Sequence, residues 1–170
     1  IVPAGKLTLL AKEGVYIAAD LTVAANNNIL VINADSDAGS TDGTLTVATG
    51  KTVTSTNSDV TITAWDLDLD GSLTAGDKTI SIHAAETGQT ISVGATTGKS
   101  LHVTAAELQR MSASDGLQVG STVAGTISVN TITQTNSQYV VPVVSLIAGN
   151  TNAQVIFDSD GAAVFNTLQV

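Results

Sequence analysis

The most regular feature of the chain is a short alternation of apolar and polar residues that recurs along most of its length. A period of two is typical of half-buried β-strands, and β-branched residues suit both faces of a strand. Gly, Asn, Asp and Ser separate the alternating stretches and supply turns. The pattern predicts short strands at residues 7–9, 15–17, 21–23, 29–32, 45–47, 60–62, 80–82, 91–93, 101–103, 117–119 and 127–129.

Internal repetition indicates how these strands are organised. Residues 7–34 align with residues 60–84 with one short gap, and a weaker third copy covers residues 144–170. A different pair relates residues 91–105 to residues 117–131. Within a copy the pattern returns after about 19–22 residues, which is the length that three short strands need to form one coil of a parallel β-helix.

We therefore expect residues 1–170 to form a single all-β unit, a right-handed parallel β-helix of about six to eight coils. Only 3% of the residues are aromatic although 43% are hydrophobic, and a narrow solenoid core has room for stacked Val, Ile, Leu and Ala. A β-sandwich of the same composition is the alternative, although its strands are longer and its turn signals come about every 8–12 residues.

Two segments interrupt the expected coils. Residues 35–43 contain no apolar side chain larger than Ala and predict a protruding loop. Thr104 and Glu107 have the spacing of a capping box, which predicts one or two helical turns after Thr104. Leu108 and Met111 lie three residues apart in this segment, so we expect both to face inward.

Composition and charge exclude several classes of protein. The 15 acidic and 6 basic residues give a net charge of -9, which disfavours binding to nucleic acid. The chain has no Cys, so it has no disulfides and no Cys-ligated metal. No apolar run approaches the roughly 18–20 residues that span a bilayer, and we expect no membrane insertion.

Residues 21–34 (LTVAANNNILVINA) and 60–82 (VTITAWDLDLDGSLTAGDKTISI) resemble the repeats of filamentous-haemagglutinin-type β-helices. This resemblance covers most of the chain and implies a secreted adhesin, surface stalk or filament. It also implies an extracellular or cell-surface location, with glycans or a host or cell surface as partners.

The sequence pattern at both ends of the chain is typical of solenoid coils, and neither end has a charged amphipathic segment that would cap the core. Exposed terminal coils present unpaired backbone and apolar columns. We therefore expect one repeat of a longer chain or filament, joined end to end with neighbouring repeats or identical copies. The residues expected at this interface are Leu7, Leu9, Val164, Phe165 and Leu168.

Two acidic segments are candidate calcium sites. Residues 66–77 match the spacing of an EF-hand loop, with acidic side chains at Asp66, Asp68, Asp70 and Asp77. A strand precedes this segment where an EF-hand needs a helix, and in a strand these acids would line the outer surface. The second candidate is the loop with Asp35, Asp37 and Asp42, which could also be simply solvated.

These observations favour a structural, non-enzymatic role without a resident cofactor. The cations are scattered, and none of the sequence fingerprints of nucleophilic or nucleotide-binding sites occurs. His83 and His102 lie about one coil apart, and two histidines without a third ligand make a poor metal site. The alternative is a carbohydrate- or calcium-dependent adhesive binding module that uses the acidic loop and Trp65.

Overall fold

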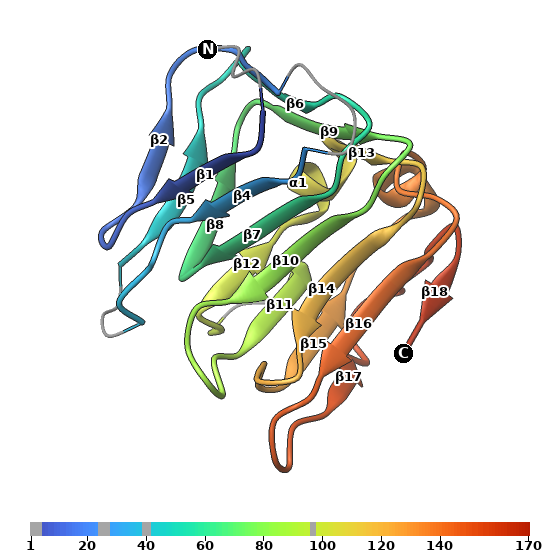
Figure 1. Cartoon of the computed structure of the whole chain (residues 1–170). Helices are drawn as coiled ribbons and strands as arrows, with labels where there is room; N and C mark the ends of the chain where they lie inside the picture. The colour runs from blue at the N-terminus through green and yellow to red at the C-terminus, as the bar shows by residue number, and fades with distance from the viewer. Residues whose placement is uncertain (1–4, 24–27, 39–41, 96–97) are drawn as a thin grey trace.

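The computed structural model describes residues 5–23, 28–38, 42–95 and 98–170, except the side chain of Leu168. These residues form a parallel β-solenoid with three faces (Figure 1). Every pairing between the described strands is parallel, so the β-sandwich alternative is wrong. Residues 39–41 of the predicted loop lie outside the described residues.

The first face is one continuous sheet of seven strands, so the solenoid has seven coils along this face. Its strands are, in stacking order, β1 (Leu7–Leu10), β4 (Leu30–Asn33), β7 (Val60–Ala64), β10 (Ile80–Ala84), β14 (Leu117–Ser121), β16 (Val144–Ala148) and β18 (Leu168–Gln169).

The second face is divided into two sheets. The first sheet contains β2 (Val15–Ile17), β5 (Thr44–Val47) and β8 (Asp66–Leu69). The second contains, in stacking order, β12 (Leu101–Val103), β11 (Ile91–Gly94), β15 (Ile127–Asn130) and β17 (Val155–Phe157). Because β12 pairs with β11 and contacts β8, it is an extra strand wedged between two successive coils.

The third face contains β3 (Leu21–Val23), β6 (Thr52–Ser55), β9 (Ser72–Gly76) and β13 (Met111–Ala113). The predicted helix is present as α1 (Ala105–Gln109), and Thr104 and Glu107 form the capping box. A 3-10 helix, η1 (Gln134–Ser137), lies in the next coil and contacts α1.

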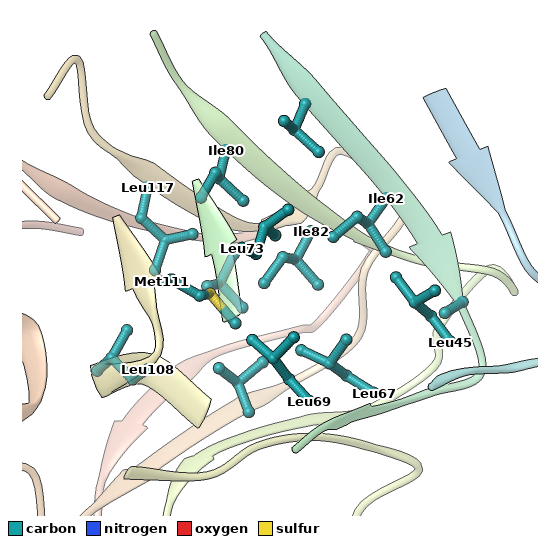
Figure 2. Close-up of a cluster of buried hydrophobic side chains, with 14 of the residues drawn as sticks. Leu45, Ile62, Leu67, Leu69, Leu73, Ile80, Ile82, Leu108, Met111 and Leu117 are labelled. Atoms are coloured by element: carbon teal, nitrogen blue, oxygen red, sulfur yellow. The ribbon is translucent and has the colours of Figure 1, made fainter. Parts of the chain in front are cut away.

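The core consists of aliphatic columns that run along the solenoid axis. On the first face Leu30, Val60 and Ile80 are paired in register and fully buried. Figure 2 shows Leu108 and Met111 directed into the core that Leu69 and Leu73 also fill, and both are 0% exposed, as the sequence predicts. The helix and the start of β13 therefore close the coil with apolar side chains.

One repeat predicted from the sequence is wrong. Ile91 does not occupy the position of Leu117, because Ile91 pairs with Ile127 on the second face while Leu117 pairs with Ile80 on the first face. Apolar–polar–apolar triplets of the same composition occur on every face of a solenoid, so their similarity does not show which face a strand belongs to. The inserted residues 95–110 also lengthen this coil and shift the repeat.

Candidate functional site

The coil formed by β1, β2 and β3 leaves an apolar groove at one end of the solenoid. Among the described strands, each of these three is the edge strand of its sheet. The groove has a volume of about 570 Å³ and is lined largely by β1, β2 and the residues around them. Leu7 and Leu9 point toward the core and are half-buried, whereas Leu10 and Tyr16 are 68% and 69% exposed. The groove thus combines an apolar floor with strand edges that no other described strand covers.

The opposite end carries the other residues predicted for end-to-end contact. Val164 is 51% exposed, and Phe165 is half-buried and packs against the core. Leu168 starts β18, the seventh strand of the first face, and its backbone pairs with Val144 of β16. The side chain of Leu168 lies outside the described residues. Phe157 on β17 is also exposed there, at 45%. The predicted interface residues therefore lie on the first and last coils.

Residues 66–77 form two strands and a corner rather than a calcium loop. Asp66 and Asp68 point outward from β8, and the alternate residues Leu67 and Leu69 are buried, as expected for a strand. Asp70 lies at the corner before β9 and is 3.7 Å from the guanidinium of Arg110. Asp77 follows β9, where its backbone N–H donates to the side chain of Asn57.

The division of the second face is bridged by acidic side chains. Asp66 Oδ1 accepts hydrogen bonds from the backbone N–H groups of Leu67 and His102 at 2.9 and 2.8 Å. Glu107 Oε1 accepts from the backbone N–H of Leu69 at 3.0 Å, and Glu107 Oε2 accepts from Thr104 at 2.7 Å. Side-chain oxygens therefore provide acceptors on the edge of β8 where a continuous sheet would provide carbonyl groups.

Arg110 completes this bridge. Its Nη1 donates to the carbonyl oxygen of Leu69 at 2.7 Å, so both backbone groups of Leu69 bond to side chains of the inserted segment. Burial raises the pKa of Glu107, and the neighbouring carboxylate of Asp66 adds to this, while hydrogen bonds from Leu69 and Thr104 act in the opposite direction. We call Asp66, Glu107 and Arg110 the polar seam. Its role in joining β8 to the insertion was not predicted from the sequence.

The two histidines do not lie one above the other. His83 is on β10 of the first face and His102 on β12 of the second. The side-chain amide of Gln118 lies 3.3 Å from His83 Nε2, and burial lowers the pKa of His83. His102 Nδ1 lies 3.3 Å from both carboxylate oxygens of Asp66. The two side chains do not stack although they lie about one coil apart in the sequence, because His102 belongs to β12, which is part of the inserted residues 95–110.

The acidic loop after β4 contains a buried carboxylate rather than only solvated ones. Asp35 is 2% exposed, while Asp37 and Asp42 are exposed. Trp65 is half-buried at the corner between β7 and β8, and its backbone N–H donates to the carbonyl of Gly43 at the end of the acidic loop. Trp65 is thus held at the corner between β7 and β8, beside the acidic loop.

Nowhere in the described ranges do three or more His, Asp or Glu side chains come together as a group that could hold a metal ion. In the same ranges no helix has both the length and the apolar character that crossing a membrane requires. Comparisons with family models, curated proteins and solved structures gave no match to this chain.

Proposed function

We propose that this chain is a structural unit of an extracellular filament, stalk or adhesin, and that units join end to end through their terminal coils. The observation that carries the proposal is the apolar groove at the first coil, with exposed Leu10 and Tyr16 beside the free edge of β1. Exposed strand edges add further strands readily, and an apolar floor beneath them gains from being covered.

The mechanism is mechanical. A strand from the last coil of one unit pairs with β1 of the next, so that the aliphatic columns and the hydrogen-bond ladders continue across the junction. The sides of the solenoid stay soluble because Thr faces outward, as at Thr22, Thr54 and Thr74 of the third face, and because the net charge is -9. This role needs no catalysis, nucleic acid or membrane insertion, and contacts with glycans or a cell surface would lie on the sides.

A double substitution in the groove tests the proposal. Leu10→Asp combined with Tyr16→Asp puts two charges beside the edge of β1 at positions that are exposed, so the fold should survive. We expect the wild-type protein to form larger species as its concentration rises in sedimentation velocity, and filaments by negative-stain electron microscopy. The double variant should remain monomeric with an unchanged circular dichroism spectrum.

Val123→Asp is the matched control. Val123 is 43% exposed, but it lies in the turn between β14 and β15 and does not line the groove. This variant should assemble like the wild type. A wild-type protein that stays monomeric at every concentration contradicts the proposal, as does equal loss of assembly in the control. Retention of such a monomer on an immobilised polysaccharide would favour the adhesive binding module instead.

A further inference from the structure

The corner between β4 and β5 buries an aspartate. Asp35 follows the buried Ala34 and is itself 2% exposed. Gly43 packs so closely against it that a Cβ atom at Gly43 would collide with the Asp35 side chain. The backbone N–H of Asp35 donates to the side chain of Asn33 at 3.2 Å, which holds Asp35 against the end of β4. A close contact with Gly43 and a backbone hydrogen bond to Asn33 therefore hold Asp35 in place.

Hydrogen bonding accounts for only one of the two carboxylate oxygens. Asp35 Oδ1 accepts from the backbone N–H of Ala38 at 3.2 Å, whereas Asp35 Oδ2 is buried and has no hydrogen-bond partner. A buried polar atom without a partner is costly and rare in folded proteins. The unmatched oxygen therefore points to a ligand that supplies what the chain does not.

The equivalent corner two coils further on shows what a satisfied buried polar residue looks like in this fold. Gln89 is 5% exposed, and its Oε1 accepts from the backbone N–H groups of Ala85 and Glu86. Its Nε2 donates to the carbonyl of Trp65. A neutral amide thus completes the corner between β10 and β11, whereas the corner between β4 and β5 carries an incompletely bonded acid.

The charges around Asp35 favour a cation. Burial raises the pKa of Asp35, and the carboxylates of Asp37 and Asp42 raise it further, while the Ala38 N–H opposes them. Lys12 Nζ lies 3.7 Å from Asp37 Oδ2 in an exposed pair. The carboxylates of Asp37 and Asp42 repel the buried carboxylate of Asp35, and a bound cation would relieve this repulsion.

We propose that this corner binds Ca²⁺, with Asp35 Oδ2 as the buried ligand and the carboxylates of Asp37 and Asp42 as exposed ligands. Calcium takes about six to eight oxygens in flexible geometry, and water fills the positions that the chain leaves. The three carboxylates are not gathered into a ready-made metal group within the described residues, so binding must draw the exposed ones inward. The affinity should accordingly be that of weak extracellular sites, with a dissociation constant of roughly 0.1–1 mM.

Thermal unfolding with and without calcium tests this site. At about 10 mM Ca²⁺, roughly ten times the upper dissociation constant, the wild-type Tm should rise by about 3–6 °C relative to EGTA. Asp35→Asn and Asp37→Asn should abolish the shift. Asp68→Asn is the control, because Asp68 is exposed on β8 and its substitution removes the same charge. Mg²⁺ should give a smaller shift, since it loses its water less readily.

Direct binding is measured with Tb³⁺ as the calcium probe. Trp65 is the one tryptophan of the chain, and its backbone contacts Gly43 beside the loop at an N–O distance of 3.1 Å. Excitation of Trp65 should sensitise Tb³⁺ luminescence, and Ca²⁺ should displace it. The signal should be lost in Asp37→Asn, which alters an exposed side chain and keeps the test open if Asp35→Asn fails to fold.

Three results would overturn the site. In the first, calcium does not change the wild-type Tm and Asp35→Asn is more stable than the wild type. Asp35 would then be a buried acid that the fold tolerates without a ligand. Another is a calcium shift that survives Asp35→Asn and Asp37→Asn, which would place binding elsewhere. The third is stabilisation by mild acid but not by calcium, because a proton shared between Asp35 and Asp37 would then satisfy the corner.

Discussion

The first and second faces of the solenoid are built from short strands of similar composition, yet only the first is continuous. On the first face seven strands pair from β1 to β18 without a break, whereas the second face separates between β8 and β12. The cause is the connection that follows the second strand of each coil. Residues 70–71 join β8 to β9, but residues 95–110 lie between β11 and β13.

The comparison shows that two different devices can satisfy the same strand edge. On the first face backbone groups of β7 bond to β4 and β10 on either side. On the second face β8 pairs with β5 on one edge and meets the polar seam on the other. Backbone pairing tolerates many side chains at a position, whereas the seam depends on three particular residues. Substitutions on the two faces should therefore lower the free energy of unfolding by different amounts.

The largest expected effect is on the continuous face. Ile62 is fully buried in the middle of the first face, so Ile62→Ala should lower the free energy of unfolding by about 3–4 kcal/mol through lost burial and an unfilled cavity. Urea denaturation measures the loss. Thr61→Ala, on the outward side of the same strand, should cost less than about 1 kcal/mol. Equal losses at the two positions would contradict the assigned register.

Removing the buried acid of the polar seam should have the next largest effect. Glu107→Ala leaves the N–H groups of Leu69 and Thr104 without their acceptor, which should cost about 2 kcal/mol. The charge is itself costly to bury, so the loss should stay below that of Ile62→Ala. Amide hydrogen exchange should speed up at Leu69. Glu13→Ala, at an exposed acid, should change stability by less than about 0.5 kcal/mol.

A smaller effect is expected for the half-exposed acid of the seam. Asp66→Ala removes the acceptor for the N–H groups of Leu67 and His102, and water reaches this site, so the loss should be about 1 kcal/mol. Asp68, two residues along β8, is the matched control, and Asp68→Ala should cost about 0.5 kcal/mol or less. If both variants unfold at the same urea concentration, Asp66 does not bridge the second face.

The pH dependence of stability gives the finest test of the seam. Burial raises the pKa of Glu107 above its ordinary 4.5, so the folded chain holds this proton more tightly than the unfolded chain. The contribution of Glu107 to stability is therefore greatest below pH 4.5 and falls as the pH rises through the raised pKa. The stability difference between wild type and Glu107→Ala should shrink over that window. A difference that does not change with pH would contradict the raised pKa.

The repeating part of the fold could be predicted from the sequence because each coil repeats the same local rule. Leu7 and Leu9 face inward with the later columns, and Leu67 and Leu69 alternate with outward acids, as the period of two requires. The short helix also followed from local chemistry, since the capping box of Thr104 and Glu107 spans only one turn.

The sequence could not predict contacts between distant coils. The capping box accounts for the contact of Glu107 with Thr104, but its contact with Leu69 joins residues 38 positions apart. The burial of Asp35 was missed because an acidic, glycine-containing loop is ordinarily solvated. The signal that could have found it is Gly43, whose missing side chain makes room for the aspartate.

The break in the second face has a consequence for a shaft made of this fold. Where β8 meets the insertion, backbone ladders connect successive coils on the first and third faces, while side chains connect them on the second. Resistance to flexing therefore differs with direction at this level, and the interrupted face is the side that opens most easily. A rod of such units would bend at regularly spaced joints, one in each unit. The rotation between neighbouring units would determine the direction in which each joint bends most easily.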